Sequence, residues 1–252
     1  MSTLADIVDH KREELSRKKR EPLEALRERA NAVKRRPLKY RNPLSLIAEV
    51  KRLSPSAGDL APGIDIVQRA LAYQRGGASA ISVLCDQRYF GGSLEDLAAI
   101  RRRVELPVLC KDFIVDPYQV WEAGAFGADL LLLIVAALND RELRHLHDLA
   151  QELGMVPLVE VHDQHDLARA IAMDARLIGI NNRNLDDFSV DLVTTEYLAP
   201  LVPDDTMIVS ESGLATPEDV RRVRSAGAQV VLIGEALMRS SDPETLIREL
   251  LA

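Results

Sequence analysis

The 252-residue chain contains little of several residue types that would define other classes of protein. It has two cysteines, Cys85 and Cys110, and neither lies in a metal-ligand spacing. This argues against a disulfide framework and a zinc site, and indicates two small core residues. No run approaches the ~18 consecutive apolar residues of a membrane helix, so no membrane partner is expected. Aromatic residues make up only 4% of the chain, which gives no sign of a sticky protein-binding surface.

Signals for nucleotide, nucleic-acid and metal binding are also missing. Neither a GxGxxG loop nor a Walker loop is present, so no nucleotide cofactor is implied. The net charge of −7 disfavours nucleic acid, because binding to a phosphate backbone needs a basic face. Two glutamates interrupt the basic run from His10 to Arg20, and we interpret this run as a solvated helix face. His145 and His147 would face different ways on a helix, so no metal is expected.

The rest of the composition is that of an ordinary globular protein, with 47% apolar and 28% charged residues. The length is close to the ~250 residues of one eight-stranded β/α barrel, and one domain over residues 1–252 is expected. The N-terminal sequence MSTLADIVDHKREEL lacks the apolar core of a secretory signal. It predicts a cytoplasmic protein.

Short apolar runs alternate with amphipathic stretches from about Leu44 onward, which is typical of repeated βα units. Capping residues before prolines, as in Asp116-Pro117 and Thr216-Pro217, indicate helix starts. Eight βα units favour an α/β fold with a single closed (β/α)8 TIM barrel over an open doubly wound sheet. The expected strands cover residues 44–51, 79–84, 107–112, 129–134, 156–161, 176–181, 206–211 and 229–233.

Residues 1–40 stand outside these eight units and predict an N-terminal helical extension. The first of its two polar helices has a capping signal in Thr3 and Asp6, and the second begins at Pro22. The physics of the sequence leaves two roles open for this extension, a brace on the barrel or a cover over its active-site end.

Lysines and carboxylates finish four of the apolar runs, in LIAEVK, PVLCKDF, PLVEV and MIVSES. Strand side chains alternate between two faces, so Glu49 and Lys51 share a face and should point into the barrel mouth. We expect desolvation to lower lysine pKa values there and to raise carboxylate pKa values, giving a proton donor and a proton acceptor near neutrality. The competing interpretation is a structural ion-pair network, but buried pairs seldom add net stability. The same parity applies to Lys111, Glu160, Asn181, Arg183 and Glu211.

Two glycines indicate a phosphate site. Gly213 follows the seventh strand and Gly234 the eighth, which is the common phosphate-binding position of such barrels. The loop from Lys51 to Gly63 adds the hydroxyls of Ser54 and Ser56 and has the length of a lid.

Seven segments, IAEVKRLSPSAG, ISVLCDQRYFGGS, PVLCKDFIVDPYQV, LVEVHD, IGINNRNL, VSESGL and VLIGEALM, occur in an order that closely resembles the indole-3-glycerol phosphate synthase family. The resemblance implies a carboxy-lyase of tryptophan biosynthesis that needs no cofactor. Its substrate would be the phosphosugar 1-(2-carboxyphenylamino)-1-deoxyribulose 5-phosphate, which is cyclised, decarboxylated and dehydrated to indole-3-glycerol phosphate.

The resemblance also implies roles for individual residues. Lys111 is the implied general acid and Glu160 the general base, while Lys51 would bind the substrate carboxylate and is a candidate donor to the leaving hydroxyl. Positions that orient the lysines and the substrate are Glu49, Asn181, Glu211 and Ser212, with Arg183 near the carboxylate. The implied phosphate contacts are Ser54, Gly213, Gly234 and the backbone of Glu235. The implied ring contacts are Phe90, Phe113, Leu132 and Leu185, covered by Pro55 and the N-terminal helices.

Some positions depart from the family pattern. Cys85 stands where threonine is expected, Ala57 where lysine is frequent and Ala236 where serine is frequent, and the connection at residues 35–44 is short. Alternatives are phosphoribosylanthranilate isomerase, a histidine-pathway isomerase or a non-catalytic barrel, but two inward lysines with Glu160 favour cyclisation. We expect a monomer, and contact with other tryptophan-pathway enzymes stays open.

Overall fold

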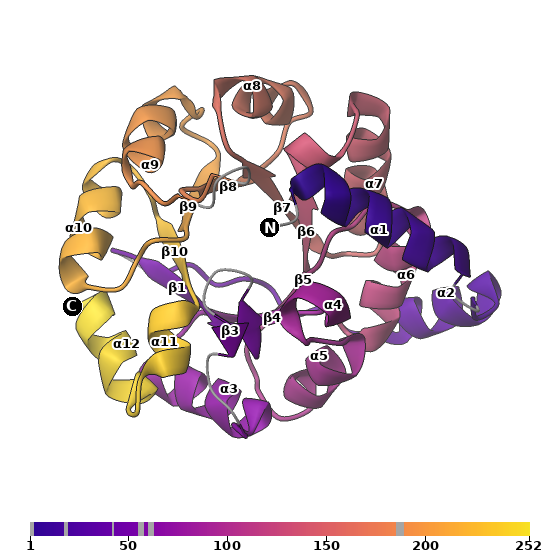
Figure 1. Ribbon diagram of the computed structural model, residues 1–252, viewed down its shortest axis with the longest axis horizontal. Helices are drawn as coiled ribbons and strands as arrows, with labels where there is room; N and C mark the ends of the chain where they lie inside the picture. Colours follow the sequence, from indigo (N-terminus) through magenta and orange to yellow (C-terminus); the bar gives the residue numbers. More distant parts are fainter. Residues whose placement is uncertain (1–2, 18–19, 42, 55–57, 60–62, 185–188) are drawn as a thin grey trace.

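Eight parallel strands close into a barrel in the computed structural model, which describes residues 3–17, 20–41, 43–54, 58–59, 63–184 and 189–252 (Figure 1). The order is β1-β10-β9-β8-β7-β6-β5-β4, and β1 closes the barrel by pairing with both β4 and β10. Each strand begins and ends within one residue of the range expected from sequence. The strands are β1 Ser45–Val50, β4 Ala80–Leu84, β5 Val108–Lys111, β6 Leu130–Ile134, β7 Val156–Val161, β8 Leu177–Asn181, β9 Met207–Glu211 and β10 Val230–Ile233.

Helices follow the strands and form an outer ring around the barrel (Figure 1). The predicted caps are confirmed, because Asp116 and Thr216 each form a capping box ahead of a proline. The ring consists of α3 Ile66–Gly76, α5 Leu94–Arg101, α6 Pro117–Phe126, α7 Asp140–Glu152, α8 Gln164–Ala172, α9 Val193–Leu198, α10 Pro217–Ser225 and α12 Pro243–Leu251. Shorter elements are α4 Gln87–Phe90, α11 Glu235–Arg239, the 3-10 turns η1 Val135–Ala137 and η2 Ala199–Leu201, and the antiparallel pair β2 Leu53–Ser54 and β3 Gly58–Asp59.

Side-chain alternation along the strands produces two apolar layers. In β1, Leu46, Ala48 and Val50 pack outward against the helices. Ile47 belongs to the core inside the barrel. Glu49 has the parity of Ile47 and therefore points inward, as the sequence predicted.

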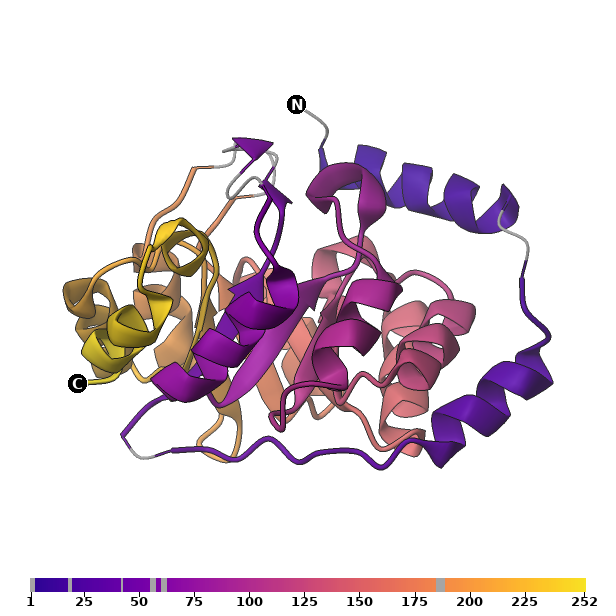
Figure 2. The same cartoon turned by 90° about the horizontal axis from the view of Figure 1, so that it is seen from below.

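The N-terminal extension takes both of the roles that the sequence left open. Helix α1 (Leu4–Arg17) lies over the mouth of the barrel, whereas α2 (Leu23–Ala32) lies beside α6 (Figure 2). The cap predicted for α1 is present, because the Thr3 N–H donates to Asp6 (2.9 Å) and the Asp6 N–H donates to the Thr3 hydroxyl (3.3 Å). None of the helices in the described part of the chain has the length and apolarity that a membrane crossing requires.

The short connection after α2 runs along the end of the barrel opposite the mouth (Figure 2). Two adjacent arginines fasten it there through backbone carbonyl groups. Arg35 donates to the carbonyls of Ala30, Gly124, Ala128 and Leu153. Arg36 donates to those of Arg101, Val104 and Leu106. Both ends of the barrel are thus in contact with the first 44 residues.

Candidate active site

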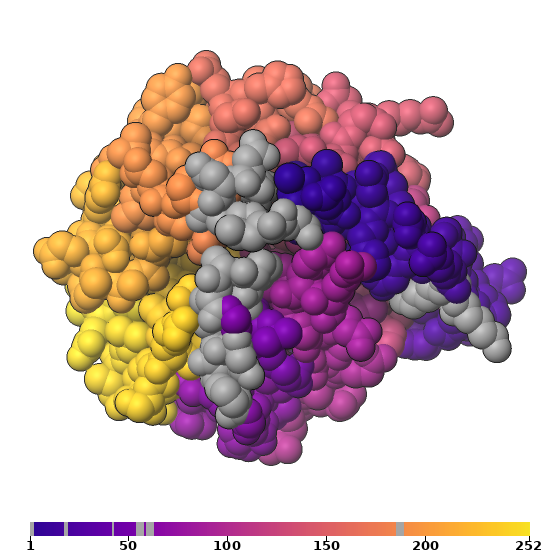
Figure 3. All heavy atoms as spheres, in the orientation of Figure 1, coloured from indigo at the N-terminus to yellow at the C-terminus, as the bar shows by residue number. Residues whose placement is uncertain are grey.

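The carboxyl ends of the strands surround a cavity of about 430 Å³. Figure 3 views the molecule from this side, with α1 across one part of the face. Most of the site residues expected from sequence line the cavity. They are Glu49, Lys51, Phe90, Lys111, Phe113, Leu132, Glu160, Asn181, Arg183, Glu211, Ser212, Gly213, Gly234 and Glu235. Pro55, Ala57, Leu185 and the Ser54 side chain lie outside the described part of the structure.

Lys111 lies at the centre of the charged groups. Its Nζ is 3.6 Å from Glu211 Oε2, 3.7 Å from Glu49 Oε2 and 3.9 Å from Glu160 Oε2. The second lysine, Lys51, lies 2.9 Å from Glu49 Oε1. Four strands therefore bring two cations and three carboxylates together, as strand parity predicted.

Two glycines leave room for this arrangement. A Cβ atom on Gly179 of β8 would lie 2.2 Å from Glu211 Oε1, and one on Gly234 would lie 2.4 Å from Glu49 Oε1. Such distances are far below van der Waals contact, so a larger residue at either position would displace a carboxylate. Glycine at these two positions therefore leaves both carboxylates in the places seen here.

The expectation of a lowered lysine pKa is wrong for Lys111. Burial alone would lower its pKa, but the three nearby carboxylates raise it above the ordinary value. The prediction failed because the sequence shows neither how many carboxylates surround this lysine nor how close they lie. Lys111 is therefore a protonated ammonium group at neutral pH, the state that a proton donor requires.

The carboxylates do not share one electrostatic environment. Burial would raise the pKa of Glu160, but the nearby His162 ring and the charge of Lys111 lower it to about 2. Burial and repulsion from Glu160 instead raise the pKa of Glu211 to about 8. The expected rise in carboxylate pKa is confirmed for Glu211 and is wrong for Glu160. It is also wrong for Glu49, because burial would raise the pKa of Glu49 but Lys51 and Lys111 lower it. Pairs of groups whose pKa values are driven apart are typical of acid–base sites.

The end of the cavity at which the sequence predicted a phosphate site begins where β9 ends. Ser212 (φ 67°) and Gly213 (φ 78°) are both in the left-handed region, which is rare for a serine and common near functional sites. A Cβ on Gly213 would also lie 2.4 Å from Val190 Cγ1. Beyond β10, the Glu235 carboxylate is paired with Arg239 at 3.0 Å, so its charge is offset beside the expected anion.

An apolar wall forms another side of the cavity. Phe90 and Phe113 stack with ring centroids 6.3 Å apart and an interplanar angle of 29°, and Leu132 lies on the same lining. Ile7 of α1 also lines the cavity. A planar aromatic ring would find apolar contacts here.

Sequence reasoning missed Lys11. Lys11 is only 3% exposed, so the prediction of a solvated face is wrong at this position. Its Nζ lies 2.6 Å from Asp86 Oδ2 and 3.1 Å from Asp112 Oδ1, which joins α1 to the ends of β4 and β5. A signal existed, because Lys11 is four residues after Ile7 and four before Leu15, on the apolar face of the helix.

His162 was also given no role from sequence. It follows Glu160 by two residues, so strand parity already placed both side chains on one face. Its Nε2 lies 3.3 Å from Glu160 Oε1, and its Nδ1 lies 3.6 Å from Asp166 Oδ2. Cys85 and Cys110, by contrast, are buried free thiols, as predicted.

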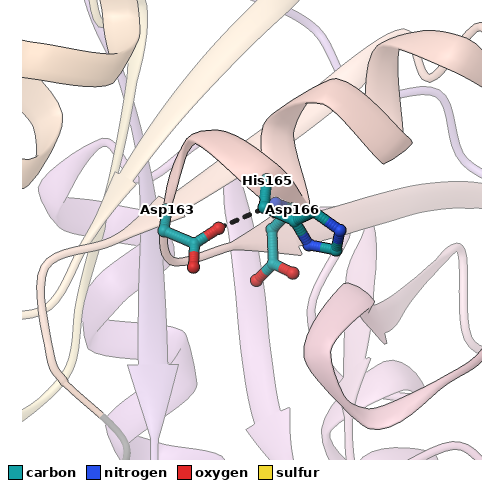
Figure 4. A group of neighbouring side chains, drawn as sticks. All are labelled: Asp163, His165 and Asp166. Carbon is teal, nitrogen blue, oxygen red and sulfur yellow. Dashed lines mark hydrogen bonds between the residues drawn. The ribbon is translucent and has the colours of Figure 1, made fainter.

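Three residues at the start of α8 form the one group of possible metal ligands among the described residues. Asp163, His165 and Asp166 place ligand atoms within 4.8 Å of one another (Figure 4). Asp163 already accepts the Asp166 N–H as the helix cap (2.8 Å), and Asp166 also contacts His162. Exposed acidic groups are often close together without an ion, so this proximity does not define a metal site.

A closed β/α barrel with partly buried lysines and buried carboxylates at its mouth defines the class: a TIM-barrel enzyme that performs acid–base chemistry on an anionic substrate. The family model described as indole-3-glycerol phosphate synthase matches residues 4–250. The chain belongs to the indole-3-glycerol phosphate synthase family. Its activity is accordingly that of a decarboxylating carboxy-lyase in tryptophan biosynthesis.

Curated relatives bearing that name cover most of the chain. One from a Nocardioides species is 56% identical over 206 residues, which cover 82% of this chain and 79% of the relative. One from Kineococcus radiotolerans is 48% identical over 263 residues, covering 100% and 96%. Among solved structures, a thiamine phosphate pyrophosphorylase from Pyrococcus furiosus has a TM-score of 0.63 at 18% identity and covers 83% of this chain and 95% of its own. At that identity the likeness shows the fold alone.

Proposed function

We propose that the charged groups of the mouth cavity catalyse the successive steps of the reaction of the family. That reaction converts 1-(2-carboxyphenylamino)-1-deoxyribulose 5-phosphate to indole-3-glycerol phosphate with loss of CO2 and water. The observation that carries the proposal is the position of Lys111, within 4 Å of three buried carboxylates. An apolar wall and the glycines of the expected phosphate region, Gly213 and Gly234, line the same cavity.

The two ends of the cavity suggest how the substrate lies. Its phosphate would be held by backbone N–H groups near Gly213 and Gly234, where strand ends meet turns. Its aromatic ring would rest against Phe90 and Phe113. The reacting ketone would then face Lys111 from between these two anchors, which is the positioning that ring closure needs.

In the first step, Lys111 gives a proton to the ketone oxygen while the ring carbon that bears the carboxylate attacks the ketone carbon. Loss of CO2 follows, and the electron pair of the broken bond returns to the ring. Lys51, with Arg183 nearby on the same lining, binds the carboxylate before it leaves. The low pKa of Glu160 and the raised pKa of Lys111 place both groups in the protonation state that these roles require at neutral pH.

Dehydration completes the indole. Glu160 removes a proton from the former methylene carbon, and the hydroxyl leaves as water after receiving a proton, for which Lys51 is the candidate donor. Glu49 orients the lysines from a position between them, with its oxygens 2.9 Å from Lys51 and 3.7 Å from Lys111. Asn181, Glu211 and Ser212 line the remaining polar wall and orient the substrate hydroxyls.

Turnover of the purified protein tests this proposal. The protein is mixed with the substrate in the absence of added metal and nucleotide, and the growth of indole fluorescence is followed. Steady multiple turnover is expected. No turnover from a protein that circular dichroism shows to be folded would contradict the assignment of this cavity as the active site.

We also propose that the chain works as a monomer in the cytoplasm. The low aromatic content of 4%, which gives no sign of a sticky protein-binding surface, supports the monomer. Light scattering of the purified protein would measure its mass, and a value near twice 27.9 kDa would contradict the monomer.

A further inference from the structure

The carboxylate of Glu160 is held at both of its oxygens. Oε1 lies 3.3 Å from His162 Nε2 and Oε2 lies 3.9 Å from Lys111 Nζ. Within the described part of the chain, Glu211 forms one ion pair, and that is with Lys111 at 3.6 Å. The two glutamates are 2% and 1% exposed, so burial does not distinguish them. Contact with His162 distinguishes Glu160 from Glu211.

His162 is itself fixed from the side away from Glu160. Its Nδ1 lies 3.6 Å from Asp166 Oδ2, and its backbone N–H donates to the same oxygen at 3.3 Å. Asp166 is buried in the first turn of α8, and the Asp163 cap fixes the start of that turn. A row of three groups, Asp166, His162 and Glu160, therefore leads from a helix start into the substrate cavity.

We propose that His162 is a positioning residue for catalysis, which holds the Glu160 carboxylate ionised and oriented so that Glu160, and not Glu211, is the base of the reaction. The inference rests on the proposed role of Glu160. Lys111 alone could not make this choice, because it approaches both glutamates at similar distances. Glu49, the third carboxylate around Lys111, already has Lys51 as a second cation at 2.9 Å. The two remaining carboxylates repel each other, so a further cation decides which one stays ionised.

The groups that face His162 support a positive charge on its ring. Glu160 approaches from its own strand and Asp166 from α8, while Arg169 lies 4.0 Å from Asp166 on the same helix. A second cavity, of about 470 Å³, is lined by His162 together with Asp163, Asn181 and Arg183. Burial alone would lower the pKa of His162, but the nearby carboxylates of Asp166 and Glu160 raise it to about 9.

The pH dependence of catalysis tests the proposal with a matched control. His162→Asn removes the cation, whereas His165→Asn changes an exposed histidine on the adjoining helix α8. We expect His162→Asn to lower kcat at neutral pH at least tenfold with KM changed less than threefold. The acidic limb of the kcat/KM profile should move up by one pH unit or more, and His165→Asn should follow the parent profile. A uniform loss of kcat with an unmoved limb would overturn the proposal.

A second measurement tests the pairing of His162 with Glu160 independently of whether Glu160 is the base. NMR titration of His162, assigned with the His162→Asn variant, should give a pKa near 9 in the parent protein and at least one pH unit lower in Glu160→Gln. This expectation holds whether or not the variant turns over. Near-normal kcat in Glu160→Gln would remove Glu160 as base and with it the catalytic role of His162. An unmoved His162 titration would overturn the proposed pairing itself, whatever the rate.

Discussion

Replacing Lys11 with methionine should release helix α1 from the barrel mouth. The Lys11 ammonium group contacts the buried carboxylate of Asp86 at 2.6 Å and the partly buried carboxylate of Asp112 at 3.1 Å. Methionine keeps most of the apolar stem but leaves the two carboxylates facing each other without a cation. Removing one partner of a buried ion pair costs about 3–5 kcal/mol. At about 1.4 kcal/mol per factor of ten, the detached state of α1 should become roughly 140-fold to 3,700-fold more populated.

Hydrogen exchange measures this release directly. Amides of residues 4–17 should lose protection in Lys11→Met, while those of α2 should not, because α2 packs on α6. Arg17→Met is the matched control, since Arg17 forms an exposed pair with Glu13 on the same helix and such pairs contribute about 0–1 kcal/mol. KM should rise more than kcat falls, because Ile7 of α1 lines the substrate cavity.

The pH dependence of that release provides a further check. Burial already raises the pKa of Asp112 when Lys11 is present, and losing the cation should raise it further. A carboxyl group whose pKa is higher in the folded state loses its stabilising contribution as pH rises. The loss of α1 protection in Lys11→Met should therefore be larger at pH 8 than at pH 5.5. Adding Asp86→Asn should restore part of the protection. If protection of α1 in Lys11→Met stays within threefold of the parent, the ion pair does not hold the helix.

Three further predictions concern the cavity. Lys111→Ala and Glu160→Gln should each reduce kcat by several orders of magnitude with an unchanged circular dichroism spectrum, and near-normal turnover in either folded variant would remove that residue from the mechanism. Glu211→Gln should raise the free energy of unfolding in urea by roughly 1–3 kcal/mol at pH 8.5 and little at pH 5. The sign follows because folding raises the pKa of Glu211 from 4.5 to about 8, so the contribution of its protonated carboxyl group to the free energy of unfolding is lost as pH rises through 8. Equal gains in stability at both pH values would contradict this reasoning. Gly179→Ala should lower kcat at least tenfold by displacing Glu211, whose Oε1 would lie 2.2 Å from the new Cβ, and an unchanged kcat would show that the carboxylate can move.

The strands and the inward direction of their charges could be predicted because both depend on local alternation. Glu49, Lys111 and Glu160 each end an apolar run at the inward parity, and eight runs fix where the strand ends meet. The capping residues at Thr3, Asp116 and Thr216 are likewise local signals.

Contacts between distant segments could not be predicted in this way. Lys11 is buried because Asp86 and Asp112 come from two strand ends elsewhere in the sequence, and nothing near Lys11 specifies them. The pKa of Lys111 was misjudged for the same reason, since its sign depends on three carboxylates from three other strands. His162 had the right parity, but its partner Asp166 becomes close only once α8 begins.

The path of the connection beneath the barrel sets an order of events during synthesis. Arg35 donates to the carbonyl of Leu153, 118 residues later in the chain. At roughly 5–20 residues per second, that partner is made roughly 6–24 s after Arg35. The register between Ser45 and Val230 requires the last strand as well. The N-terminal segment is therefore synthesised first but must wait for most of the chain before it reaches its final place, and a nascent chain halted before Leu153 would keep that arginine without this acceptor.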